Sequence, residues 1–557
     1  MTMKRYILAF AAATLFVLPA IAQEINHTVE VTNAYEGAVT DIRKPERTMS
    51  IPDSVTRFNL DFDYSVFDNP YKGSYEFRPY LVTMKPQRTY SDASTLYVKA
   101  GLGYTFRPEA QIIWTPTLKN GLLSDIHASH TSYFGRYWNM DTGNYSADGD
   151  LLYTRKSTFH DGFDMENNVG ADFGFSWGKG SATISADYIG IGAKSPDALL
   201  QHHSGKVAVH VASNTLEDNT FLYDVNTSAR YGVGPFPEFR YKLDASAGPS
   251  LNEHNTILVD LSADYANVDG GGFSAGVVSV MPKYRLTLSG IDLWVGVKLS
   301  LDFNKLDWTG NYSFHKTYQP IFPMVKARYA LIRDKLSVFA SLTGGRTLNT
   351  PTDLVEMRHF VVMDEARYAS GVSVERFNAR IGFEGNLFSR FQYSLSGGFA
   401  GIADGLVDAI VTPAASTAPV PSLMTASYGL AYADGKFALN RSGFGLDGTV
   451  RVRYATLDAV NAVKPALLSG HARVWYNWFD RIKAGLTGEF ATDRVGTDGT
   501  VEFRIPAWFD LGAFAEYNVG NYGLWLRGGN LLNRTIQRNP LIAERGIYVT
   551  GGIRVNF

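Results

Sequence analysis

Apolar and polar residues alternate with a period of two along most of this chain. In residues 546–557 one face of the pattern is apolar, and its members are Ile547, Val549, Ile553, Val555 and Phe557. The same alternation runs through residues 291–303, 391–399, 446–454, 472–478, 482–490 and 509–519. Successive side chains of a strand point to opposite faces, so each segment is predicted to be a β-strand with one apolar and one polar face.

The predicted strands are long. They have about 10 to 13 residues, whereas strands of soluble proteins usually have about five or six. About 9–11 residues tilted by about 45° are enough to cross an outer membrane. A soluble sandwich or propeller would use shorter strands, so a membrane barrel is the favoured fold and a soluble β-fold is the alternative.

The connections between the strands have two lengths. Short turns are predicted at residues 178–180, 333–334, 387–388, 434–435, 479–480 and 520–521, and long polar loops at 135–160, 195–218, 305–318, 348–368 and 401–422. Short turns on one rim and long loops on the other are typical of outer-membrane barrels. About 19 spans can be counted from Leu96 to Phe557. An even number is required, so a strand near residues 75–84 would give 20 and a missed hairpin 22.

The chain is therefore predicted to be an all-β protein. Residues 92–557 form a single transmembrane antiparallel β-barrel of about 20–22 strands, with short periplasmic turns and long extracellular loops. Length alone would allow several soluble domains, but the chain shows neither a second domain nor a solenoid-type repeat.

The first 22 residues have the pattern of an export signal. Lys4 and Arg5 precede an apolar run from Tyr6 to Pro19, and Ala20-Ile21-Ala22 fits the small-x-small cleavage rule. The apolar run is too short to span a bilayer comfortably, so a signal peptide cleaved after Ala22 is favoured over a retained anchor helix. The mature protein is predicted to reach the outer membrane of a Gram-negative cell envelope.

Composition excludes several classes of protein. The 52 basic and 54 acidic side chains give a net charge of −2, which argues against a nucleic-acid partner. The absence of cysteine excludes disulfides, thiolate metal sites and a cysteine nucleophile. A mean hydropathy of −0.11 is too low for a helical membrane protein.

No motif predicts an enzyme, a cofactor or a metal site. Residues 272–276 match G-x-S-x-G, but the hydrolase elbow needs a strand, a sharp turn and a helix, and no helical pattern follows here. His127 and His130 are three residues apart, which places them on opposite faces of a strand. We therefore expect no catalytic residues and no cofactor.

The last strands carry a family resemblance. Residues 524–533 read Leu-Trp-Leu-Arg-Gly-Gly-Asn-Leu-Leu-Asn, and the final strand ends at Phe557. This segment resembles the C-terminus of TonB-dependent receptor barrels, which have 22 strands and import scarce nutrients. The resemblance implies that Phe557 is the signal recognised by the barrel-assembly machinery.

The N-terminal part departs from that family. Its members carry a plug of well over a hundred residues, whereas only residues 23–91 precede the barrel here. Residues 61–66 and 75–79 resemble plugless receptor-like proteins of the Bacteroidetes type. We expect residues 23–91 to be a periplasmic or lumenal segment without a full plug. Within it, Thr28, Val29, Glu30, Val31 and Thr32 are similar to the TonB box, which pairs by strand addition; an ordinary extended tail is the alternative.

Charged side chains on the polar faces are predicted to face the lumen. A Lys or Arg on the lipid face costs about 2–4 kcal/mol at mid-depth. The candidates are Arg451, Arg453, Arg473, Lys483, Glu489, Asp510 and Glu516. Their mixed sign favours ion pairs that stiffen the wall, or independent charges in water, over a selective ion pore.

Three functions are compatible with the sequence. The first is a transporter, or a transport component, for a bulky nutrient, and the second is a structural barrel that docks other envelope proteins. The third is a passive porin or an outer-membrane enzyme. An empty barrel of this width would leak, so the lumen is expected to hold the N-terminal segment, inward loops or a partner. The expected partners are outer-membrane lipid, the assembly machinery, and either TonB or a lumen-filling or surface protein.

Overall fold

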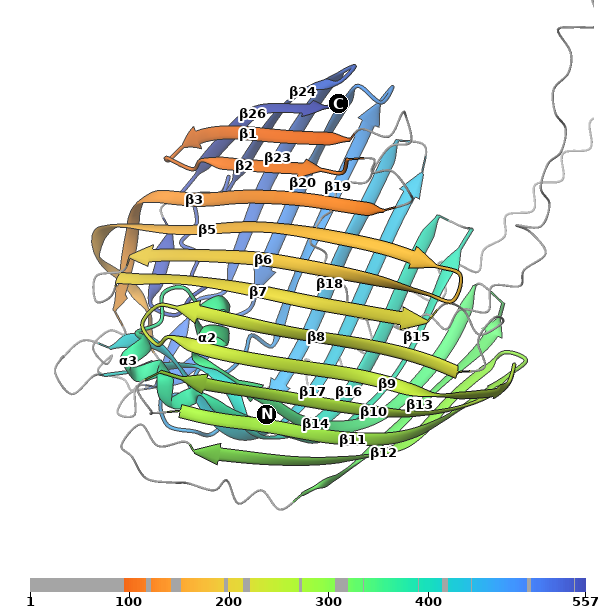
Figure 1. Cartoon of the computed structure of the whole chain (residues 1–557). Coiled ribbons are helices and arrows are strands. Elements are labelled where there is room, and N and C mark those ends of the chain that lie inside the picture. Colours follow the sequence, from red (N-terminus) through yellow and green to blue (C-terminus); the bar gives the residue numbers. More distant parts are fainter. Residues whose placement is uncertain are drawn as a thin grey trace, which may run out of the picture. The chain divides into compact units, whose positions relative to one another are not determined.

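The computed structural model describes residues 95–557 apart from 117–121, 142–151, 195–198, 214–220, 270–272, 306–318, 334, 389, 413–418, 442, 498–501 and 545. Within these residues, 22 strands form one closed antiparallel barrel (Figure 1). The first eleven are β1 (Leu96–Tyr104), β2 (Glu109–Trp114), β3 (Leu123–Asp141), β5 (Arg155–Trp177), β6 (Gly180–Lys194), β7 (Leu199–Ser213), β8 (Phe221–Val233), β9 (Glu238–Asn252), β10 (Asn255–Val268), β11 (Phe273–Leu288) and β12 (Ile291–Lys305). The others are β13 (Ile321–Ile332), β14 (Leu336–Asn349), β15 (Gly371–Leu387), β16 (Phe391–Val411), β17 (Val420–Arg441), β18 (Phe444–Ala455), β19 (Leu468–Trp478), β20 (Ile482–Ala491), β23 (Trp508–Val519), β24 (Tyr522–Gly529) and β26 (Tyr548–Asn556).

The barrel is closed by the first and last strands. β1 pairs with β2 on one side and with β26 on the other, from Tyr97↔Asn556 to Tyr104↔Val549. The Leu96 amide donates to the Phe557 carbonyl at 2.9 Å, and the Phe557 amide donates to the Leu96 carbonyl at 2.8 Å. Closure leaves no unpaired edge, as a membrane barrel requires.

The predicted all-β barrel is confirmed, with 22 strands. All of them lie between Leu96 and Phe557, so the 19 spans counted there from the sequence were too few. The further strand expected near residues 75–84 lies outside the described residues.

The connections define two rims. Eight turns of two or three residues share the rim where the barrel begins and ends, which we call the turn rim. They are residues 178–179, 253–254, 289–290, 333–335, 388–390, 442–443, 479–481 and 520–521. The longest connections, such as residues 350–370, 456–467, 492–507 and 530–547, lie at the opposite rim, the loop rim.

Several predicted connections were wrong. Asp434-Gly435 is not a turn but the middle of β17, where Asp434 pairs with Arg453 at 2.7 Å. Most of the loop expected at 195–218 is β7, the missed hairpin. The loops expected at 135–160 and 401–422 are shorter, because the strands that flank them extend beyond the point where strict alternation ends.

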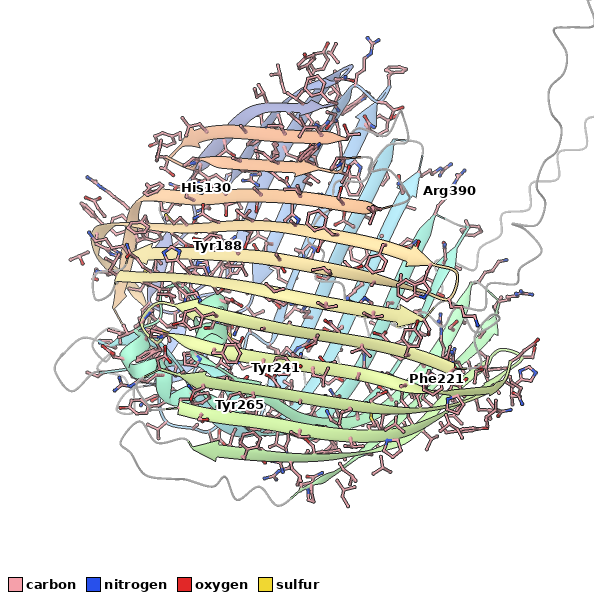
Figure 2. All side chains as sticks on the ribbon, in the orientation of Figure 1. His130, Tyr188, Phe221, Tyr241, Tyr265 and Arg390 are labelled. Atoms are coloured by element: carbon pink, nitrogen blue, oxygen red, sulfur yellow. The ribbon has the colours of Figure 1, made fainter. Side chains whose placement is uncertain are left out.

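The two faces of the wall differ as the alternation predicts. On β12 the outer face exposes Ile291, Val295, Val297, Leu299, Leu301 and Phe303, while Ser300 and Asp302 lie on the other face. Figure 2 shows Tyr188, Tyr241 and Tyr265 along the outer face nearer the loop rim, and Phe221 at the turn rim. Aromatic girdles that flank an apolar band are typical of barrels in lipid.

Most of the tightly buried apolar side chains lie near the loop rim. There the connections pack on the inner faces of the strands, and two short helices, α2 (Pro351–Met357) and α3 (Met363–Ala366), lie among them (Figure 1). None of the described helices is long and apolar enough to cross a bilayer.

Candidate functional site

The segment between β14 and β15 folds into a small helical unit, which we call the cap segment (residues 350–370). Thr350 caps α2: its hydroxyl accepts a hydrogen bond from the Asp353 amide, and the Asp353 carboxylate accepts one from the Thr350 amide. Pro351 occupies the first turn, where its fixed φ suits a helix and no amide is needed. α3 and a 3₁₀ turn (Arg367–Ala369) complete the segment.

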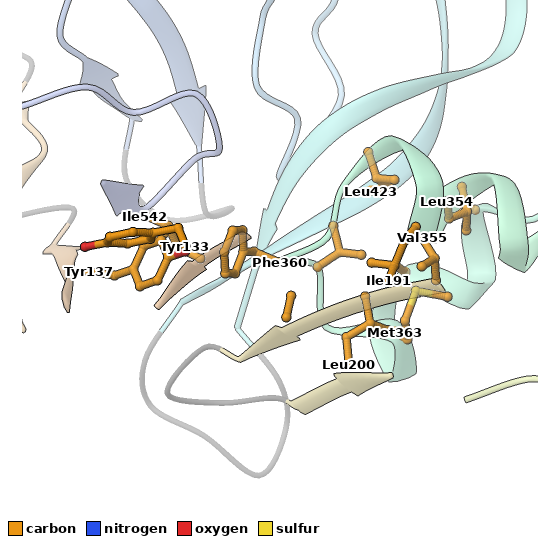
Figure 3. Close-up of a cluster of buried hydrophobic side chains, with 14 residues drawn as sticks. Tyr133, Tyr137, Ile191, Leu200, Leu354, Val355, Phe360, Met363, Leu423 and Ile542 are labelled. Atoms are coloured by element: carbon orange, nitrogen blue, oxygen red, sulfur yellow. The ribbon is translucent and has the colours of Figure 1, made fainter. Parts of the chain in front are cut away.

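The cap segment crosses the mouth of the barrel. It starts and ends between β14 and β15, yet it packs against side chains of β3, β6, β7 and β17 (Figure 3). The Phe360 ring lies 5.2 Å from the ring of Tyr137 on β3, and the Val362 amide donates to the Pro421 carbonyl of β17 at 3.2 Å. Contacts with inner faces on both sides of the barrel require the segment to span the lumen.

Ion pairs hold the start of α2 to the wall. Asp353 accepts from Arg240 of β9 at 2.8 Å and from Arg230 of β8 at 3.1 Å. Arg240 also pairs with Asp264 of β10 at 2.7 Å, and Arg230 pairs with Glu238 of β9 at 3.2 Å. Because every charge in this network has an opposite partner within hydrogen-bond distance, burial does not leave an isolated charge.

Glu238 also contacts α2 directly. Its side chain is 1% exposed, and its second carboxylate oxygen accepts from the Thr352 amide at 2.9 Å. A carboxylate at this position satisfies an amide that has no partner within the helix. The first turn of α2 is therefore bonded to two adjacent wall strands, β8 and β9.

A second ion-pair group holds the far end of α2. Arg358 donates to both oxygens of Asp408 on β16, at 2.9 and 3.1 Å, and Arg494 donates to the same carboxylate at 3.3 Å. Arg494 also donates to the Gln537 carbonyl at 2.9 Å, which joins this group to the 530–547 loop. A small cavity beside it has room for about one water molecule.

The third attachment is a histidine. Nδ1 of His359 lies 2.7 Å from an oxygen of Asp164 on β5. Burial lowers the pKa of His359, but the hydrogen bond and the charge of Asp164 outweigh burial, and the pKa lies above its ordinary value. The protonated imidazole is thus the form that the contact stabilises.

Other loops of this rim pack beside the cap segment. β21 (Arg494–Thr497) and β22 (Glu502–Ile505) form a small sheet with β4 (Leu152–Tyr153), and β25 (Ile542–Glu544) pairs with β3. Phe503 and Ile505 are buried with Ile410 and Leu541. The described loops thus make continuous apolar contacts at the mouth.

The predicted lumen-facing residues lie on the wall face opposite the apolar outer face. Three of the seven pair with another charge of the wall. Arg453 contacts Asp434 at 2.7 Å, Arg473 contacts Asp447 at 2.8 Å, and Glu516 contacts Arg554 at 3.2 Å.

The other lumen candidates differ in their partners. Glu489 and Asp510 both accept from Arg538 of the 530–547 loop, at 2.8 and 2.7 Å. The Lys483 ammonium lies 5.2 Å from the Trp475 ring, and Arg451 is exposed. These candidates do not converge on one site, because they are spread along the wall.

Phe557 lies at the seam of the barrel. Its side chain is half exposed on the same face as Ile553, and its ring meets that of Tyr522 edge-on at 6.2 Å. The signal peptide, the segment 23–91 and the TonB-box-like residues 28–32 all lie outside the described residues.

Sequence reasoning missed the residues that attach the cap segment. They are Asp164, Arg230, Glu238, Arg240, Asp264, Asp353, Arg358, His359, Asp408 and Arg494. Among the described residues no group of His, Asp or Glu is arranged to hold a metal ion. Ser274 of the G-x-S-x-G match lies within β11 and not on an elbow. The arrangement places across a wide lumen a segment that is held by ion pairs and apolar contacts.

Comparison with known proteins identifies the fold. No protein-family model and no curated protein matches the sequence. The FrpB iron transporter of Neisseria meningitidis matches with a TM-score of 0.60 and 12% identity, over 84% of this chain and 82% of that one. The copper transporter OprC matches with a TM-score of 0.56 and 10% identity, over 85% and 81%.

The siderophore receptor PirA of Acinetobacter baumannii matches with a TM-score of 0.55 and 8% identity, over 83% of this chain and 80% of that one. The chain has the barrel fold of TonB-dependent receptors. At these identities the likeness is one of fold. This likeness agrees with the resemblance of the C-terminal strands. The likeness and the apolar outer face together support an outer-membrane location.

Proposed function

We propose that this chain is an outer-membrane transporter, or a component of one, for a bulky nutrient, and that the cap segment gates its mouth. The carrying observation is that one 21-residue segment (residues 350–370) spans the lumen of a 22-stranded barrel and is attached to it by ion pairs and apolar side-chain contacts, not by strand pairing. Ion pairs and short helices can be released without unfolding the wall, whereas the strands cannot. The fold neighbours carry the names of iron and copper transporters and of a siderophore receptor, which supports transport.

The proposal extends to segments outside the described residues. Residues 1–22 are removed on export, residues 23–91 occupy the periplasmic side or the lumen, and Thr28 to Thr32 engage TonB. A segment that crosses the mouth disfavours a passive porin. A scaffold that docks envelope proteins remains the second candidate, because the packed loops of the rim also present a structured surface.

Single-channel recording tests the gate. Wild-type barrels in planar bilayers are expected to be closed or nearly so, and replacement of residues 351–369 by a Gly/Ser linker of equal length is expected to give long-lived open channels. Lys464→Gln, which removes an exposed ion pair with Asp458 on another loop of the rim, is the control. Equal conductance in all three proteins would refute the gate.

A separate experiment tests energised transport. Cells that need the barrel for growth on a complex nutrient should lose that growth when TonB is removed or when residues 28–32 are deleted. Growth that depends on the barrel but not on TonB, together with stable co-purification of other envelope proteins, would favour the scaffold.

A further inference from the structure

Two turns of the turn rim carry a feature that the other turns lack. Phe388, between β15 and β16, and Phe479, between β19 and β20, are 87% and 94% exposed. They are the two most exposed large apolar side chains among the described residues. The other described short turns of this rim have Gly, polar or charged residues at their tips.

Both phenylalanines also have a strained backbone. Their φ angles are +57° and +52°, in the left-handed region where a side chain with a Cβ is disfavoured. Asn or Gly would be the ordinary choice at such a position of a tight hairpin. Strain and exposure both oppose folding, so the Phe side chains are expected to have a use outside the chain.

The two turns have the same local structure. In each turn an Arg follows the Phe by two residues, and its amide closes the turn: Arg390 donates to the Leu387 carbonyl at 3.2 Å and Arg481 to the Trp478 carbonyl at 3.0 Å. Arg441 is exposed at the turn between them, from β17 to β18. Within the described residues these three guanidinium groups have no ion-pair partner, and the nearby Asp480 carboxylate accepts from Asn477 at 2.9 Å.

The outer face of the wall continues into both tips. Tyr476 and Trp478 pack against each other on the outer face directly before Phe479, with ring centroids 4.7 Å apart. Phe391 and Tyr393 do the same directly after Phe388, at 6.0 Å. The aromatic girdle of the barrel thus runs into the turns, where the cations begin.

We propose that this arc of the turn rim is a binding surface for phospholipid headgroups. Phe388 and Phe479 insert among the headgroups, and Arg390, Arg441 and Arg481 bind their phosphates. Aromatic rings favour the interfacial depth, and guanidinium groups bind phosphate in a bidentate manner. The two tips are four strand positions apart, about 20 Å at about 4.8 Å per strand. Isolated tips at this spacing suit separate lipid anchors better than the continuous apolar centre of a protein interface.

Cysteine labelling tests this surface, since the chain has no native cysteine. Phe388→Cys and Phe479→Cys would each carry an environment-sensitive fluorophore in liposomes of phosphatidylethanolamine and phosphatidylglycerol. Gly178→Cys, at the polar β5–β6 turn of the same rim, is the matched control. Folding of each variant is checked by heat-modifiable migration.

The labels at 388 and 479 are expected to lose quenching by aqueous iodide and to gain quenching by headgroup spin-labelled lipid, relative to the label at 178. Equal behaviour of the three labels would overturn the proposal. Shielding in native membranes but not in protein-free liposomes would also overturn it, because the occupant would then be a protein.

A second variant tests the charges and leaves the phenylalanines in place. Arg390→Gln, Arg441→Gln and Arg481→Gln together are expected to reduce the number of phosphatidylglycerol molecules retained per barrel in native mass spectrometry. Lys464→Gln at the loop rim is the control and should retain the wild-type number. Unchanged retention in the triple variant would refute the phosphate contacts.

Discussion

At the scale of single residues, the left-handed phenylalanines give a prediction about stability. Phe479→Asn should stabilise the detergent-solubilised barrel by about 1 kcal/mol, because Asn tolerates the left-handed region that costs other residues about 1–2 kcal/mol. Chemical unfolding, followed by heat-modifiable migration, measures this change in stability. Phe391→Asn is the control, since Phe391 lies in a regular strand, and it should not stabilise. A destabilised Phe479→Asn barrel would show that the ring makes contacts within the protein.

The terminal residue gives a second prediction at this scale. Deletion of Phe557 should lower the amount of folded barrel in outer membranes, because the residue completes the β1–β26 seam and its ring lies on the lipid-facing side. Phe557→Tyr keeps an aromatic ring and should restore the yield. Normal insertion of the deleted protein would contradict a role in assembly.

The His359–Asp164 contact predicts a pH-dependent gate. The pKa of His359 is raised in the folded protein, mainly by its bond to Asp164 against the opposing effect of burial. The contact therefore stabilises the closed cap fully below the ordinary pKa of about 6.5, and this stabilisation is lost as the pH rises through the raised value. Hydrogen exchange of residues 352–369 should become faster over that interval. His359→Gln should remove the pH dependence, and persistence of the dependence in that variant would assign it to another group.

At the scale of elements, the wall could be predicted and the cap segment could not. Strand positions follow from period-two alternation because one face of each strand meets lipid, and this condition holds around the whole barrel. β7 was missed because both of its faces are mixed near the loop rim: Gln201 and His203 lie beside Leu199 on the outer face, and Leu200 lies beside His202 on the inner face. Asp434-Gly435 has the composition of a turn, but cross-strand pairing decides its conformation.

The sequence does contain one signal for the cap segment. Thr350-Pro351 with Asp353 is a capping box with Pro at the first helical position, followed by Leu354 and Val355. It predicts a helix start inside the polar loop predicted at residues 348–368. The partners of that helix could not be predicted, because Arg230, Arg240 and Asp408 belong to strands far away in the sequence and nothing local shows that they converge.

The attachment of α2 gives the prediction for this element. Asp353→Asn removes two ion pairs and weakens the capping box, so the cap segment should lose about 1–3 kcal/mol of local stability while the wall stays folded. Hydrogen exchange of residues 351–357 measures the loss. Asp364→Asn in the same segment is the control, because Asp364 is highly exposed and its pair with Arg367 is long, at 3.7 Å. Similar effects of the two variants would show that the local stability depends on the net charge of the segment and not on the contacts of Asp353.

At the scale of the whole molecule, the cap segment crosses one end of a lumen whose other end is the turn rim. The lumen of a 22-stranded barrel is too wide and too long for one 21-residue segment to fill. We therefore expect another part of the chain, or a partner, to occupy the turn-rim side as well. Residues 23–91 are the part of the chain available for this. A segment of that length buries only a small core and is marginally stable alone, which suits a filler better than an independent domain.

Removal of residues 23–91 tests that arrangement. If the segment and the cap close the lumen in series, the deletion should raise conductance modestly in the wild-type barrel and strongly in the Asp353→Asn background. If a partner fills the lumen together with the segment, the deletion should release a co-purifying protein. Barrel folding should be intact in either case, because β1 begins after the deleted residues and closes against β26 without them. A deletion that changes neither conductance nor co-purification, in both backgrounds, would make the segment a passive leader, and the lumen-filling and TonB-box hypotheses would fail together.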